Sequence, residues 1–255
     1  MRFMTTPHLF ILTGASRGMG LSMARQLLVP GHTLLCISRT ESPALAQPAQ
    51  QTGATLVQWC HDLAESSTLA PRLEGWLREQ ASISWRSATL INNAGVIARI
   101  GPLSEAEPAD LTSSLRVGLE APMLLTAAFL RATQGWPAAR KVLNISSGLG
   151  RRPMASQAAY CAAKAGMDHF SRCLALEEGL KAGGAKVCSL APGVIDTDMQ
   201  LQLRSANPAS FPDHESFARL KSAGQLTSPD DAARRVLACL ARPDFGAQPV
   251  ADVRD

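Results

Sequence analysis

A glycine-rich turn near the N-terminus constrains the fold of this chain more than any other stretch. Residues 8–12 form a short apolar run that predicts a buried parallel strand. Gly14, Gly18 and Gly20 follow at once, and residues 21–28 then show the apolar spacing of a helix. This order makes a pyrophosphate site, because small residues let backbone N–H groups approach phosphates and a helix N-terminus favours negative charge. The alternative, an exposed glycine turn without a ligand, is disfavoured by the flanking strand and helix.

The alternation of strands and helices continues along the chain. Further strands are predicted at 33–38, 55–60, 88–91, 141–145, 186–190 and 248–253, and helices at 66–80, 105–133, 158–180 and 229–240. Pro122 is expected to interrupt the helix over 105–133, and residues 41–53 are read as a variable helix or loop. We predict a single α/β domain over 1–255, a Rossmann-type, doubly wound parallel sheet of about seven strands flanked by helices.

Tyr160 and Lys164 lie four residues apart, which places them on one face of a predicted helix. The pKa of tyrosine is ordinarily about 10, too high for a general acid or base at neutral pH, and a nearby ammonium lowers it. Ser147 ends the apolar run before that helix, where its hydroxyl would lie beside the phenol. The three side chains predict a site for a carbonyl or carbinol oxygen. Such a Tyr/Lys pair alone more often marks a solvated helix face, but Tyr160 is the only tyrosine.

These motifs resemble those of the short-chain dehydrogenase/reductase family. The matching segments are 13–20, 92–95, Ser147, the pair Tyr160 and Lys164, and Pro192-Gly193, in the family's order. The resemblance implies that Ser147, Tyr160 and Lys164 are catalytic. It further implies a set of cofactor-binding residues: Gly14, Ser16, Arg17, Gly18, Met19, Gly20, Arg39, Asp62, Leu63, Asn93, Ala94, Gly95, Tyr160, Lys164, Pro192, Gly193, Ile195 and Thr197.

Arg39 directly follows the predicted second strand and indicates which cofactor is bound. A site selective for NAD usually places a carboxylate here to bind the ribose 2′-hydroxyl, whereas an arginine suits a 2′-phosphate. Ser38 and Thr40 add hydroxyls, Arg17 adds a second guanidinium, and no acid precedes Glu41 in this stretch. We therefore predict NADP(H). The alternative is that Arg39 is merely exposed.

One position departs from the family pattern. The family has an asparagine of its catalytic tetrad where this chain has Gly118, and the backbone carbonyl of that asparagine holds a water that connects to the lysine. Glycine is the residue most tolerant of a distorted helical turn. We therefore hypothesise that the carbonyl of Gly118 maintains this proton relay.

A narrower likeness concerns the substrate. Segments 160–164, 174–178 and 191–200 resemble the sepiapterin reductase and benzil reductase branch, which reduces vicinal dicarbonyls with NADPH. We predict reduction of a ketone or vicinal dicarbonyl to an alcohol, with Tyr160 as proton donor. Residues 199–227 are predicted to be a lid over the small-molecule carbonyl substrate. The alternatives are NADP-linked alcohol oxidation and a redox sensor that binds NADP(H) without turnover.

The composition argues against a nucleic-acid-binding, membrane-spanning or metal-binding protein. The net charge of +4 is mild and the arginines are scattered, so no nucleic-acid surface is expected, and Arg151-Arg152 is read as a solvated loop. No apolar stretch reaches the roughly 18 residues that span a bilayer. Six dispersed cysteines favour buried free thiols in the cytoplasm, and the histidines show no metal-ligand spacing. The family resemblance implies a homodimer or homotetramer.

Overall fold

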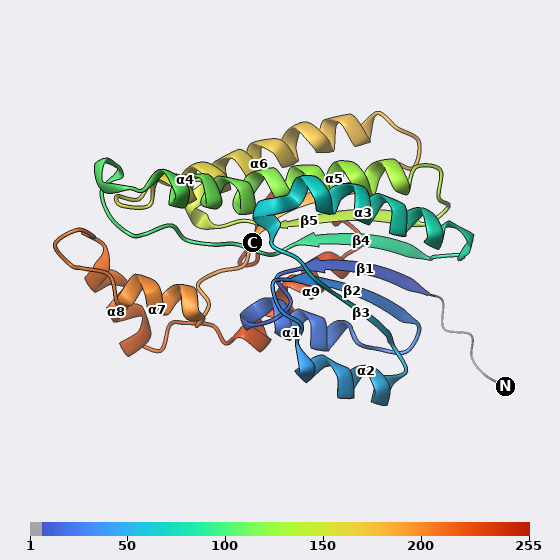
Figure 1. The fold of residues 1–255 in the computed structure, drawn as a ribbon, viewed down its shortest axis with the longest axis horizontal. Helices are drawn as coiled ribbons and strands as arrows, with labels where there is room; N and C mark the ends of the chain where they lie inside the picture. Colours follow the sequence, from blue (N-terminus) through green and yellow to red (C-terminus); the bar gives the residue numbers. More distant parts are fainter. Residues whose placement is uncertain (1–6) are drawn as a thin grey trace.

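The computed structural model describes residues 7–255, which fold around one seven-stranded parallel sheet (Figure 1). Its strands are β1 (His8–Thr13), β2 (His32–Ser38), β3 (Thr55–Cys60), β4 (Ser87–Asn92), β5 (Ala139–Ile145), β6 (Lys186–Ala191) and β7 (Val250–Asp252). Their order is β3-β2-β1-β4-β5-β6-β7, so the chain crosses from one half of the sheet to the other between β3 and β4. Ligands bind outside the carboxyl ends of the strands at such a switch point. The predicted fold class is confirmed.

Helices cover both faces of the sheet. They are α1 (Gly18–Leu27), α2 (Ala46–Thr52), α3 (Ser66–Glu79), α4 (Pro108–Leu115), α5 (Ala121–Ala132), α6 (Ala158–Gly179), α7 (Asp198–Arg204), α8 (His214–Ser222) and α9 (Pro229–Ala241). Figure 1 shows α1, α2 and α9 on one face and α3, α5 and α6 on the other. None of the helices within residues 7–255 combines the length and the apolar character that crossing a bilayer requires.

The packing of the core explains why the sequences of the strands are continuous apolar runs. Along β1, Leu9 and Ile11 pack into the cluster beneath α3 and α5, whereas Phe10 and Leu12 pack into the cluster beneath α1 and α9. Successive side chains of a strand point to opposite faces, and here both faces are covered. Burial on both sides therefore removes the alternation of apolar and polar residues that a half-exposed strand would show.

The helix predicted over 105–133 is broken one turn earlier than expected. A π-helical segment, Arg116–Glu120, separates α4 from α5, and Pro122 is the second residue of α5. Proline has no N–H, so Pro122 cannot donate to the carbonyl of Gly118 as the fourth residue on does in a regular helix. Gly118 is buried, and a Cβ added to it would lie 3.0 Å from the Cβ of Ala163 in α6. The distortion expected at Gly118 is present, and it lets the two helices approach closely.

The 199–227 segment contains two helices rather than an irregular connection. Figure 1 shows α7 and α8 in orange, to one side of the sheet. Phe211 and Phe217 form a small separate cluster with Met154 and Leu203. The Ser156 hydroxyl also donates to the carbonyl of Ser210 at 2.5 Å. The segment thus packs against the loop that precedes α6.

Candidate active site

One cavity of about 620 Å³ lies along the carboxyl ends of the strands. Every residue predicted for catalysis or cofactor binding lines it: Gly14, Ser16, Arg17, Gly18, Met19, Gly20, Arg39, Asp62, Leu63, Asn93, Ala94, Gly95, Ser147, Tyr160, Lys164, Pro192, Gly193, Ile195 and Thr197. Residues 7–255 hold no group of three or more His, Cys, Asp or Glu side chains arranged to bind a metal ion.

The glycine turn has a shape that only glycine allows. Gly14 has a φ of +71°, in the left-handed region. A Cβ on Gly20 would lie 2.0 Å from the carbonyl oxygen of Gly14, so α1 packs directly onto the turn. Asn93 holds the turn from β4, because its Nδ2 donates to the carbonyls of Thr13 at 3.0 Å and Gly14 at 3.2 Å. This turn and the N-terminus of α1 fit a dinucleotide pyrophosphate.

The end of β2 presents fewer phosphate donors than predicted. The Ser38 hydroxyl accepts the N–H of Ala15 at 2.8 Å and so ties β2 to the glycine turn, and Thr40 does not line the cavity. Arg39 lines the cavity and is exposed, with no ion pair to the described residues. Arg17 pairs with Asp198 at 3.0 Å, but both side chains are exposed, so this pair contributes little to stability. The groups that fit a 2′-phosphate are therefore Arg39, Arg17 and the Ser38 hydroxyl, whose hydrogen remains available for donation.

The remaining cofactor-binding predictions fall on the two flanks of the cavity. On one flank the Asp62 carboxylate accepts the N–H of Ala64 at 2.9 Å, and buried Leu63 follows it. On the other flank Gly193 has a φ of +83°, and Thr197 directly precedes α7. A Cβ on Gly18 would lie 3.4 Å from Thr197, so this flank touches the glycine turn.

The three predicted catalytic side chains come from two neighbouring elements. Ser147 follows β5, and its hydroxyl oxygen accepts the N–H of Leu149 at 3.1 Å. Tyr160 and Lys164 lie in the first turns of α6. The Lys164 ammonium is buried, lies 5.7 Å from the centre of the Tyr160 ring and donates to the carbonyl of Ile145 at 2.7 Å. All three side chains line the same cavity.

Burial dominates the acid–base properties of this site. It raises the pKa of Tyr160, although a hydrogen bond with Ser147 opposes the shift. Burial also lowers the pKa of Lys164 to about 8, against the nearby Asp168 carboxylate, which raises it. The lowering of the Tyr160 pKa by Lys164 that we expected is not found in this structure. The reason is that desolvation of the phenolate prevails while Lys164 lies near the ring and donates to Ile145.

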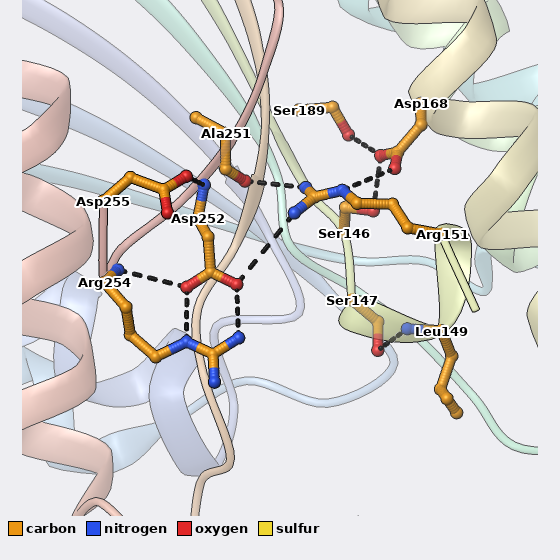
Figure 2. Close-up of polar contacts among 10 residues, drawn as sticks. All are labelled: Ser146, Ser147, Leu149, Arg151, Asp168, Ser189, Ala251, Asp252, Arg254 and Asp255. Carbon is orange, nitrogen blue, oxygen red and sulfur yellow. Dashed lines mark hydrogen bonds and ion pairs between the residues drawn. The ribbon is translucent and has the colours of Figure 1, made fainter.

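Two sequence interpretations near the cavity are refined. Arg151 is exposed in a turn, as expected, but its guanidinium also donates to Asp168 at 3.4 Å and to the carbonyl of Ala251 at 2.7 Å (Figure 2). Arg152 is exposed as well, and it lines the cavity. The six cysteines are all free, but Cys60 and Cys173 are exposed rather than buried.

Several cavity residues carried no motif that could have identified them. Asp252 and Arg254 line the cavity from the C-terminal end of the chain, and no local pattern signals this position. Asp168 does not line the cavity but contacts Ser146, which does, and it had one usable signal: it lies four residues after Lys164 and therefore on the same helix face.

Comparison with known proteins agrees with this geometry. A family model described as short chain dehydrogenase matches residues 8–208. Benzil reductase ((S)-benzoin forming) of Bacillus cereus is 35% identical over 92% of this chain and 94% of its own length. Sepiapterin reductase of Meriones unguiculatus is 34% identical over 92% of each chain.

Two solved structures share the fold. A 3-oxoacyl-[acyl-carrier protein] reductase from Brucella melitensis in complex with NAD has a TM-score of 0.80 and 23% identity, covering 98% of this chain and 96% of its own. A metagenomic short-chain oxidoreductase in complex with NADP has a TM-score of 0.72 and 26% identity, covering 97% of this chain and 95% of its own. The first likeness concerns the fold alone.

Proposed function

The chain belongs to the short chain dehydrogenase family, oxidoreductases that use a nicotinamide cofactor, and from this premise we propose that it reduces a ketone or vicinal dicarbonyl to an alcohol with NADPH. One observation carries the proposal. A single cavity is lined by Ser147, Tyr160 and Lys164 together with the glycine turn and Arg39. The similarity to benzil and sepiapterin reductases supports a carbonyl substrate.

The side chains divide the chemistry of reduction between them. A reduced nicotinamide, when bound, supplies the hydride. The Tyr160 hydroxyl donates a proton to the carbonyl oxygen, and the Ser147 hydroxyl donates a hydrogen bond to the same oxygen. Burial raises the pKa of Tyr160 and so weakens the phenol as an acid, and proton donation therefore relies on the Lys164 ammonium to stabilise the phenolate that forms. Lys164 adds a donor beside the phenol and a contact for the cofactor ribose.

We assign resupply of the proton to a water that would donate to the carbonyl of Gly118 and connect it to Lys164. Pro122 offers this carbonyl no N–H, and the π-helical turn around Gly118 packs against α6 just before Lys164. An oxygen that lacks its regular helical donor is free to accept from a water. The departure from asparagine at position 118 is thus compatible with a relay through the backbone.

Two cations support NADP(H) over NAD(H). Arg39 directly follows β2 and is free of ion pairs to the described residues, and Arg17 has only its exposed partner Asp198. A guanidinium binds a 2′-phosphate through paired hydrogen bonds, and no carboxylate stands at position 39 to repel it.

The rest of the cavity favours an apolar substrate. Leu149, Met199, Leu203 and Phe217 line it, and the last three belong to the 199–227 segment, which we assign as the lid. Phenyl substituents such as those of benzil suit this wall. We further propose a cytoplasmic homodimer or homotetramer: all six thiols are free, and Leu115 and Leu176 are exposed on α4 and α6.

The test is the loss of NADPH absorbance, with NADH in parallel, against a vicinal diketone, a simple ketone and a pterin with a dicarbonyl side chain. Turnover of the dicarbonyls with NADPH would support the proposal. A preference for NADH would contradict the role of Arg39. Faster oxidation of alcohols with NADP⁺ would favour the dehydrogenase alternative, and tight NADPH binding without turnover would favour the redox sensor.

A further inference from the structure

A buried carboxylate lies next to the proposed catalytic residues without being one of them. Asp168 of α6 is 1% exposed and lies one helical turn after Lys164. The hydroxyls of Ser146 and Ser189 donate to its Oδ1 at 2.6 and 2.7 Å. Arg151 donates to its Oδ2 at 3.4 Å (Figure 2). Asp168 thus joins α6 to β5, to β6 and to the turn that follows β5.

These contacts hold both ends of the stretch that carries Ser147. Ser146 directly precedes Ser147, and Arg151 directly follows the tight turn Gly148–Gly150. The turn lies against α6, since a Cβ on Gly150 would be 2.9 Å from Asp168 Oδ2 and 2.9 Å from the Lys164 carbonyl oxygen. Figure 2 shows the hydroxyl of Ser147 directed toward Leu149. In sequence, Ser147 lies between Ser146 and Arg151, which both contact Asp168.

Arg151 extends the network to the end of the chain. Its Nη2 donates to the carbonyl of Ala251 at 2.7 Å, and its Nη1 lies 4.0 Å from Asp252. Asp252 in turn accepts from Arg254 at 2.7 and 2.6 Å. β7 and the residues after it are tied in this way to the same turn (Figure 2).

A buried ionic network is weak evidence for stability, because desolvation offsets much of the attraction. Such a network does order the groups it touches. Glu178 shows the contrast: it is a second buried carboxylate of α6, but its partners, Arg140 and Lys181, do not line the cavity. Asp168 does not line the cavity itself, but its partner Ser146 does.

We propose that Asp168 is a positioning residue that, through Ser146 and Arg151, holds the hydroxyl of Ser147 beside the phenol of Tyr160. This inference rests on the proposed function, since it gives Ser147 its role on the reacting oxygen. A displacement of about 1 Å in such a group can cost about 100-fold in rate.

The kinetic test compares Asp168→Asn with the matched control Glu178→Gln. We expect Asp168→Asn to lower kcat about 10- to 100-fold while the Kd for NADPH stays within about twofold. On the Ser147→Ala background the same change should alter kcat by less than about twofold, because coupled residues are not additive. Glu178→Gln should keep kcat within about twofold of the wild type. Equal losses on both backgrounds, or the same loss in Glu178→Gln, would overturn the proposal.

Crystal structures supply a readout that needs no turnover. The turn 147–151 should be displaced in Asp168→Asn and unchanged in Glu178→Gln. If Asp168→Asn does not fold, Ser146→Ala removes one of the same contacts. It should then show the same loss of kcat, the same unchanged Kd for NADPH and the same displacement of the turn 147–151. A wild-type protein inactive on every carbonyl would refute the proposed function, while an unmoved turn in the variant would refute the positioning role.

Discussion

At the scale of single residues, the proposed chemistry depends most on the phenol of Tyr160. Burial holds the pKa of its hydroxyl above the ordinary value, against the influence of Ser147, which lowers it. The neighbouring lysine shows the opposite shift, to a pKa of about 8. Proton donation from this phenol therefore depends on Lys164 remaining charged, because the ammonium is the group that can stabilise the phenolate as it forms.

We expect Tyr160→Phe to lower kcat about 10²- to 10⁴-fold, because it removes the proton donor and keeps the ring. The Kd for NADPH, measured by fluorescence titration, should change by less than about twofold. Phenylalanine fills the same space, so the thermal midpoint should stay near that of the wild type. Loss of NADPH binding together with turnover would instead mean that the residue is structural.

We expect Arg39→Ala to raise the Kd for NADPH about 10- to 100-fold and to leave the Kd for NADH unchanged, because only NADPH carries the 2′-phosphate. Arg25→Ala is the matched control, since Arg25 is also exposed, on α1, but does not line the cavity. Equal weakening of both cofactors would contradict selection by Arg39.

At the scale of elements, the π-helical turn between α4 and α5 packs closely against α6. Gly118 faces Ala163 of α6, and the segment is buried there. A side chain at position 118 would therefore push α5 away from the helix that carries Tyr160 and Lys164.

We expect Gly118→Ala to reduce the free energy of unfolding in urea by about 1–3 kcal/mol through overpacking. In a chain that already carries Ala163→Gly, Gly118→Ala should reduce the free energy of unfolding by less, because the opposing methyl group is gone. An equal loss of unfolding free energy in the wild-type and Ala163→Gly chains would show that the contact with Ala163 is not the cause of the destabilisation.

The same geometry decides how the relay is tested. Gly118→Asn restores the residue type of the family, but it introduces the same steric conflict with Ala163. Turnover against pH should therefore be measured with Gly118→Asn on the Ala163→Gly background. A large gain in rate would mean that the relay through the Gly118 carbonyl is impaired; an unchanged rate agrees with a backbone relay.

At the scale of the whole molecule, the closed core on both faces of the sheet sets how stability responds to alkaline pH. Burial raises the pKa of Cys36 in β2 to about 12 and that of Cys188 in β6 to about 11. These thiols remain protonated in the folded state while the unfolded chain ionises near pH 9. Above pH 9 the unfolded state therefore binds fewer protons, and the free energy of unfolding falls. Lys164 acts in the opposite sense between pH 8 and 10.5.

We expect Cys36→Ala to reduce the stability loss between pH 8 and pH 10 by about 1.4 kcal/mol relative to the wild type. Urea unfolding at the two pH values measures it, and the contribution of Lys164 cancels in the comparison. Cys173→Ala changes an exposed thiol and should keep the pH dependence of the wild type. If Cys36→Ala lost as much unfolding free energy between pH 8 and pH 10 as the wild type, the Cys36 thiol would not titrate as described.

The sequence alone was sufficient to predict the sheet, the glycine turn and the three residues Ser147, Tyr160 and Lys164. These features have local signals: apolar runs for strands buried on both faces, glycines at positive φ, and a spacing of four on a helix. The order of the motifs then identified the family, because each motif has its own position in a shared topology.

Only the tertiary structure decided the surroundings of those residues. The buried environment that raises the pKa of Tyr160, and the pairing of Arg151 with Asp168, depend on segments far apart in the sequence. The contact between Gly118 and Ala163 also depends on segments far apart in the sequence, and so does the position of Asp252 at the cavity. Desolvation and ion pairing are set by what packs around a group, and no local pattern encodes that.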